Sequence, residues 1–101
     1  PDMLLDIVRG VEDSRLRLCL DLGHVNAYSK VSERDWIEKC GAYLSHLHIH
    51  NNDGSWDTHS ALYEGTLPIR ELLDIAMRET EATATLELPK CEPSVKWLLE
   101  E

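Results

Sequence analysis

The stretch Leu16-Arg-Leu-Cys-Leu-Asp-Leu-Gly-His24 decides the fold class, because apolar residues alternate along it as far as Gly23. A period of two is typical of a β-strand with one buried face. We therefore predict a strand over residues 16–22 that ends at Gly23. Two further stretches have strand character, residues 43–50 and residues 83–88.

Apolar residues at helical spacing separate these strands and predict the order α-β-α-β-α-β-α. We expect the second helix to begin at Ser32, where Ser32-Glu-Arg-Asp35 resembles a capping box. Strands that alternate with helices predict an α/β fold with parallel pairing. Because three parallel strands leave sheet edges open, we expect a slice of a barrel or of a larger sheet. The first helix is expected over residues 2–9. The third should follow Pro68 and bury Leu72, Leu73, Ala76 and Met77. The last should begin near Pro93 and bury Val95, Leu98 and Leu99.

Composition excludes some classes of function. The formal net charge of the 101 residues is -9, with ten basic residues scattered among nineteen acidic ones, which argues against a nucleic-acid partner. No apolar run is long enough for a membrane span. Cys19, Cys40 and Cys91 form no C-x-x-C pair, so we expect small core residues and a reducing, cytoplasmic location. The start at Pro1 leads us to expect a chain cut from something longer.

Groups that can bind a metal follow each predicted strand. Functional residues of barrels lie at the carboxyl ends of strands. Residues two apart share a face of a strand, which places Cys19 with Asp21, Leu44 with His46 and His48, and Thr83 and Thr85 with Glu87. If these faces point into a barrel, the carboxylates and imidazole converge at its rim. Two carboxylates with an imidazole suit a divalent ion such as Zn²⁺ or Mn²⁺.

Each candidate has a plainer interpretation. A lone aspartate at a strand end forms turns, and a lone inward histidine is often a hydrogen-bonded core residue. For Asp21, His48 and Glu87 together we favour metal ligation; for His24, Asp57 and His59 loop positions make solvated side chains the rival interpretation. We expect His46 to be structural or substrate-facing; His50 could be either, with a place on the surface as the default. Trp56 covers a substrate or packs, and residues 51–54 form a turn. Trp36 and Trp97 are expected to pack between helix and barrel.

The motifs Asp21-Leu-Gly-His24, His48-Ile-His-Asn51, Asp57-Thr-His59, Glu64-Gly65 and Leu86-Glu-Leu-Pro89 follow one another along the chain. Together they resemble the xylose-isomerase-like barrel superfamily. This superfamily includes sugar-phosphate isomerases and epimerases, ketose 3-epimerases, inosose dehydratases and endonuclease IV. The resemblance covers essentially the whole chain. It implies that residues 1–101 are a partial domain, the C-terminal part of a TIM (β/α)₈ barrel, about strands six to eight with flanking helices.

The resemblance also implies roles for single residues. The family's strand-six aspartate falls on Asp21 and its following histidine on His24, while the strand-seven histidine falls on His48 and the strand-eight glutamate on Glu87. In the single-metal epimerases the Asp, His and Glu positions bind the ion with a strand-five glutamate, for which this sequence has no counterpart. The position of His24 usually contacts substrate there. Epimerases commonly have an arginine where Asp57-Thr-His59 stands, which resembles a ligand pair of endonuclease IV, so the number of ions stays open.

The activity that the resemblance implies first is a metal-dependent sugar or sugar-phosphate isomerase or epimerase. Glu87, as ligand and acid/base, and the strand-five glutamate would exchange a proton at the carbon beside the carbonyl through an ene-diolate, while His24 would orient a substrate hydroxyl. Zn, Mn, Co or Mg would be the cofactor, and a sugar the small-molecule partner. The alternatives are an endonuclease IV-type apurinic-site phosphodiesterase with several zinc ions, and an inactive fragment that only associates with itself or with the missing N-terminal half.

Overall fold

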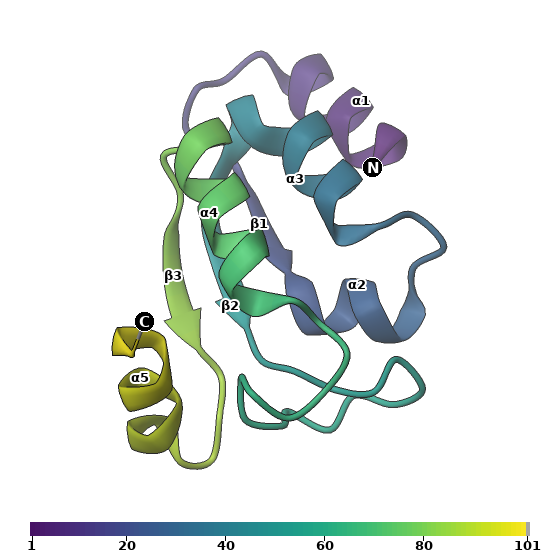
Figure 1. The fold of residues 1–101 in the computed structure, drawn as a ribbon. Coiled ribbons are helices and arrows are strands. Elements are labelled where there is room, and N and C mark those ends of the chain that lie inside the picture. The colour runs from purple at the N-terminus through teal and green to yellow at the C-terminus, as the bar shows by residue number, and fades with distance from the viewer. Residues whose placement is uncertain (101) are drawn as a thin grey trace.

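The computed structural model describes residues 1–100 and contains a three-stranded parallel sheet (Figure 1). Its strands are β1 (Leu18–Asp21), β2 (Leu44–Ile49) and β3 (Thr83–Leu86), side by side in the order β1-β2-β3. Both pairs are parallel. The three predicted strands and their parallel pairing are confirmed, although each strand is shorter than predicted.

The connecting helices are amphipathic and lie mainly on one side of this sheet (Figure 1). The side chain of Ser32 accepts a hydrogen bond of 3.2 Å from the backbone N–H of Asp35, which confirms the expected start of the helix there. The helix α5 begins at Cys91, before the expected start near Pro93, and lies beside the carboxyl end of β3. The bounds are α1 (Asp2–Val11), α3 (Glu33–Cys40), the 3₁₀ turn η1 (Gly41–Tyr43), α4 (Ile69–Glu79) and α5 (Cys91–Leu99).

A short helix, α2 (Leu22–Tyr28), stands directly after β1, where we expected the strand to continue to Leu22. Asp21 ends the strand because its carboxylate caps the new helix, accepting a hydrogen bond of 2.9 Å from the backbone N–H of His24. Asp21 is therefore both the last residue of β1 and the N-cap of α2.

The two faces of the sheet differ in chemistry. Leu20, Leu47 and Ile49 are buried and belong to one hydrophobic cluster with residues of the helices. The opposite face carries polar side chains, among them His46 and His48, and stays accessible in the described part of the chain. Trp36 and Trp97 pack against the cluster, as expected. The fold thus presents a polar face that ends at the carboxyl edge of the strands.

The register of β1 and β2 shifts near the start of the pair, because Leu18 pairs with Leu44 while Cys19 pairs with His46. Ser45 is the extra residue, as in a β-bulge. The expectation that Leu44 shares a face with His46 is therefore wrong, and Leu44 is buried in the core. From His46 onward the alternation holds.

Several expected core residues are exposed. Met77 is 80% exposed, because it lies about 100° around the helix from the buried Ala76. Cys19 is exposed as well, since it lies on the polar face of the sheet. Partial desolvation of the thiol, together with the negative charges of Asp21 and Glu87, raises the pKa of Cys19. On α5, Val95 and Leu99 are likewise exposed.

Within residues 1–100, no helix has both the length and the apolar character that crossing a bilayer requires.

Candidate metal centre

Asp21, His48 and Glu87 come together at the carboxyl end of the sheet, and we call them the strand-end group. Asp21 is the register partner of His48 across the β1–β2 pair. The backbone N–H of Glu87 donates to the carbonyl oxygen of Ile49 at 3.0 Å, which continues the β2–β3 ladder past Leu86. Glu87 thereby keeps the alternation of Thr83 and Thr85.

The distances within the strand-end group are short. Nδ1 of His48 lies 3.3 Å from Oε1 of Glu87 and 3.9 Å from Oδ2 of Asp21. One potential ligand atom from each of the three residues lies within 4.8 Å of the others. Ligand atoms at such separations can share one ion at about 2.0–2.2 Å from each. The expected convergence of these side chains is present; their role as ligands stays a prediction.

The two oxygens of Asp21 have different surroundings. Oδ1 accepts the capping hydrogen bond from the backbone N–H of His24. Oδ2 lies 3.4 Å from Nδ1 of His24 and faces His48. One oxygen is thus used by the start of α2, and the other is left for the strand-end group.

A second set of potential ligands lies above the first, and we call it the loop group: His24, His50, Asp57 and His59. Nε2 of His24 lies 3.0 Å from Oδ2 of Asp57, and Nε2 of His59 lies 3.3 Å from Oδ1 of the same carboxylate. Asp57 is therefore the centre of this group. His24, which is exposed, touches both groups through Asp21 and Asp57.

A hydrogen bond to the backbone of Glu87 orients the ring of His59. Its Nδ1 lies 2.8 Å from the backbone carbonyl oxygen of Glu87, and its φ of 50° is in the left-handed region. The hydrogen bond to that carbonyl, with help from the charges of Asp57 and Glu87, raises the pKa of His59 against the opposing effect of burial. A histidine whose second nitrogen donates to a backbone carbonyl is a common arrangement for metal ligands.

His50, which we expected on the surface, is completely buried. Its Nε2 lies 2.8 Å from Oδ1 of Asp21, and its Nδ1 lies 3.6 Å from Oδ1 of Asp57. The surface expectation is wrong because α2 folds back over the end of β2 and covers this position. Parity places His50 on the same face as His46 and His48, but it does not predict burial, which here depends on the packing of α2.

The buried amides of Asn51 and Asn52 hold the loop that carries Asp57 and His59. Asn51 donates to the carbonyl oxygens of Leu62 and Leu67 at 2.9 and 3.2 Å. Asn52 donates to the carbonyl oxygen of Gly23 at 2.9 Å, which ties the loop to α2. The turn expected at these residues is thus also the anchor of the loop group.

The two remaining candidates, His46 and Trp56, belong to neither group, although the ring of His46 lies edge-to-face against His48 with centroids 5.4 Å apart. Nδ1 and Nε2 of His46 lie 2.6 and 2.7 Å from the hydroxyl oxygens of Thr83 and Thr85. Because the Thr83 hydroxyl donates to the carbonyl oxygen of Ser45, it accepts from Nδ1–H of His46, and Nε2 accepts from Thr85. Trp56 is 68% exposed in the loop, directly before Asp57 in the chain.

The donor atoms fit a divalent cation. Both groups combine carboxylate oxygen with imidazole nitrogen, the ligand types that Zn²⁺ and related ions prefer. Oδ1 of Asp57 is buried and makes no hydrogen bond with any described residue. An unpaired buried carboxylate oxygen is costly unless a cation or another donor faces it.

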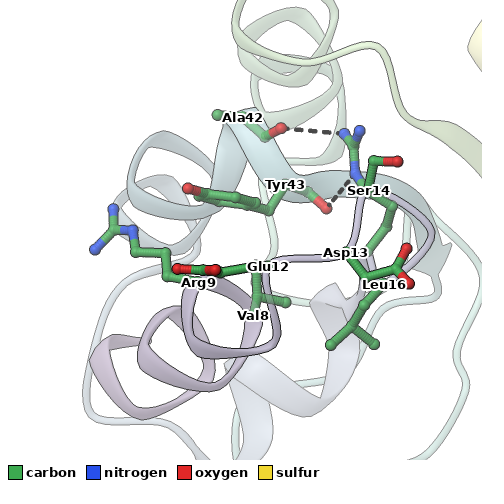
Figure 2. Close-up of a pocket in the computed structure, with 9 residues that line it drawn as sticks. Val8, Arg9, Glu12, Asp13, Ser14, Leu16, Ala42 and Tyr43 are labelled. Atoms are coloured by element: carbon green, nitrogen blue, oxygen red, sulfur yellow. Dashed lines mark hydrogen bonds between the residues drawn. The ribbon is translucent and has the colours of Figure 1, made fainter.

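A separate pocket of about 330 Å³ is lined by residues of α1 and of the segments that lead into β1 and β2 (Figure 2). The guanidinium of Arg17 borders it but is held by the carbonyl oxygens of Ala42 and Tyr43, each 3.1 Å away. The pocket gathers none of the metal-binding candidates, so its chemistry differs from that of the carboxyl end. Figure 2 labels Val8, Arg9, Glu12, Asp13, Ser14, Leu16, Ala42 and Tyr43 around it.

The chain is similar to known proteins in sequence and in fold. The chain is 46% identical over 54 residues to the fructoselysine 3-epimerase of Shigella flexneri, across 52% of this chain and 20% of that protein. It is 31% identical over 75 residues to the uncharacterized protein MJ1311 of Methanocaldococcus jannaschii, across 73% of this chain and 26% of that protein. The crystal structure of a D-tagatose 3-epimerase-like protein superposes with a TM-score of 0.77 at 27% identity, over 95% of this chain and 37% of that chain.

The chain therefore spans about a quarter or less of the length of these curated relatives. The likeness to the structure of the D-tagatose 3-epimerase-like protein confirms the expected α/β fold as part of a barrel. The profile of the family described as Xylose isomerase-like TIM barrel matches residues 1–101. The chain belongs to the xylose isomerase-like TIM barrel family.

Proposed function

We propose that the complete protein is a metal-dependent sugar or sugar-phosphate isomerase or epimerase. The observation that carries the proposal is the strand-end group, whose three potential ligand atoms lie within 4.8 Å of one another at the carboxyl end of parallel strands. Relatives named as 3-epimerases support the same reaction class. Asp21, His48 and Glu87 would hold the ion, together with a glutamate that the family resemblance places on a fifth strand.

The chemistry divides between the ion and the chain's own side chains. A bound divalent ion supplies a Lewis acid that polarises a substrate carbonyl. Glu87 and the strand-five glutamate that the resemblance implies would exchange a proton at the carbon beside that carbonyl: one would remove it, leaving an ene-diolate, and the other would return a proton to the opposite face. The exposed imidazole of His24, next to Asp21, is placed to orient a substrate hydroxyl.

The direct test follows hydrogen exchange at carbon. The complete protein, loaded with Mn²⁺ or Co²⁺, is incubated with ketoses and ketose phosphates in D₂O, and deuterium at the carbons next to the carbonyl is measured by NMR. We expect enzyme-dependent incorporation that Glu87→Gln abolishes. The exposed Glu81→Gln is the matched control, and it should behave as the wild type. Incorporation that Glu87→Gln leaves unchanged would contradict the role of Glu87.

The loop group favours a second candidate, an apurinic-site phosphodiesterase with several metal ions. Its Asp57 with His24 and His59 forms a further set of donors beside the strand-end group. The net charge of -9 weighs against a DNA substrate. Incubation of the metal-loaded protein with an abasic-site duplex decides between them, since only the phosphodiesterase would nick it.

A further inference from the structure

His50 lies at the junction of the strand-end group and the loop group. Its two ring nitrogens face Oδ1 of Asp21 at 2.8 Å and Oδ1 of Asp57 at 3.6 Å. Neither nitrogen is aligned for a hydrogen bond with a described residue, and the ring is completely buried. A buried polar group without a partner costs about 1–3 kcal/mol, so this position calls for a role that a hydrophobic residue cannot fill.

Two contacts hold the ring where it is. A methyl group added at Gly23 would overlap Cε1 and Nδ1 of His50, so the backbone of α2 packs directly on the edge of the ring. The ring of His59 stacks on His50 with centroids 3.8 Å apart and planes 9° from parallel. The orientation of His50 therefore depends on Gly23 and His59.

The stacking decides what His50 can do. A metal ion binds an imidazole nitrogen in the plane of the ring, along its lone pair. Two rings that stack face to face, as His50 and His59 do, cannot both direct a lone pair at one ion. Since His59 already has the donor contact to the Glu87 carbonyl that suits a ligand, His50 acts on a carboxylate instead.

We propose that His50 is a positioning residue of the metal centre: the ion-pair contact of its Nε2 with Oδ1 of Asp21, 2.8 Å away, keeps Oδ2 directed toward an ion that Asp21, His48 and Glu87 would hold. The inference rests on the proposed function, because it needs an ion at the strand-end group. The backbone N–H of His24 and the ring of His50 would then hold Oδ1 from two sides. Partners of this kind typically change metal affinity 10–100-fold when removed.

The test compares two replacements of His50 in the complete protein, with Co²⁺ as the probe. Glutamine places its amide nitrogen near the position of Nε2, whereas the shorter asparagine places it near Nδ1. We expect His50→Asn to weaken Co²⁺ binding by about 10–100-fold and to alter the visible absorption bands of the bound ion. His50→Gln should recover most of the affinity and the wild-type bands.

A second pair of variants consists of Gly23→Ala, which displaces the ring of His50 without replacing it, and Gly10→Ala, its control. Gly23→Ala pushes on His50, although alanine is the better helix former in α2, and should weaken Co²⁺ binding as His50→Asn does. Gly10→Ala in α1, where an added methyl group meets nothing within 4 Å, should leave binding unchanged. If circular dichroism shows that His50→Asn is unfolded, the Co²⁺ affinity of Gly23→Ala tests the inference instead.

Three results would overturn the inference: wild-type Co²⁺ affinity in His50→Asn, equal losses in His50→Asn and His50→Gln, or unchanged affinity in Gly23→Ala. Each differs from failure of the proposed function. If the proposed function is wrong, the wild-type protein itself will bind no Co²⁺, or will bind it without exchanging substrate hydrogen.

Discussion

Nδ1 of His48 lies 3.3 Å from Oε1 of Glu87, although one residue belongs to β2 and the other follows β3. The pair is brought together by the parallel ladder, which continues through the hydrogen bond from Glu87 N to Ile49 O. Both side chains are about one-third exposed, at 35% and 34%, so the pair remains open to a ligand.

Replacing Glu87 by Gln should abolish turnover in the complete protein and leave its fold intact. The amide has nearly the same volume, but it lacks the charge and the basicity that proton transfer needs. We expect a loss of at least about 10²–10⁴-fold in kcat, the usual contribution of a positioned acid or base. Steady-state kinetics together with thermal unfolding will check this, and full activity in the variant would contradict it.

Removal of metal should inactivate the protein reversibly. Dialysis against a chelator is expected to abolish isomerisation, and Mn²⁺ or Co²⁺ should restore it, because the strand-end group combines carboxylates with imidazole. Metal analysis before and after dialysis gives the stoichiometry. One ion per chain points to the strand-end group alone, whereas a second ion lost with Asp57→Asn points to the loop group as well. Activity that survives complete metal removal would refute the metal dependence.

Replacing His46 should act on stability or substrate fit rather than on metal binding. His46 bridges Thr83 and Thr85 through both ring nitrogens, and each lost hydrogen bond costs about 0.5–1.5 kcal/mol. We expect His46→Leu to lower the free energy of unfolding by about 1–3 kcal/mol or to raise KM, with Co²⁺ affinity unchanged. Urea unfolding and titration with Co²⁺ separate these effects, and a selective loss of Co²⁺ affinity would show that His46 belongs to the metal site.

Gly65→Ala should loosen the loop that carries Asp57 and His59. A methyl group at Gly65, which has a φ of 152°, would overlap the side chain of Asn51 and the backbone carbonyl oxygen of Asn52. The strain and the displaced amide together should cost about 1–3 kcal/mol in unfolding free energy. Gly10→Ala is the control, since an added methyl group there meets nothing within 4 Å. Equal stability of the two variants would contradict the proposed anchoring by Asn51.

The 101-residue chain expressed alone should associate with itself and show no catalysis. Both outer strands have an unpaired edge within the described chain, and an open groove of about 510 Å³ beside β1 is lined by the exposed side chains of Leu4 and Tyr28, among others. Exposed apolar surface of this kind drives association. Size-exclusion chromatography with light scattering measures it, and a stable monomer at micromolar concentration would oppose the expectation.

Local patterns were enough to predict the alternation of strands and helices and the meeting of Asp21, His48 and Glu87. Side chains alternate along every strand, and parallel strands end at the same edge, so residues at the carboxyl ends must converge once the pairing is known. The cap at Ser32 was predictable for the same reason, since it depends on residues within one turn.

The tertiary structure alone decided the burial of His50 and the role of Asn51 and Asn52. Their environment depends on α2 folding over the end of β2 and on a loop whose ends meet through buried amides, contacts between residues far apart in the sequence. The helix α2 itself was missed because a single carboxylate, Asp21, both ends a strand and caps a helix, and the periodicity of so short a segment does not separate the two. Long-range packing thus determined which histidine faces solvent and which lies between two carboxylates.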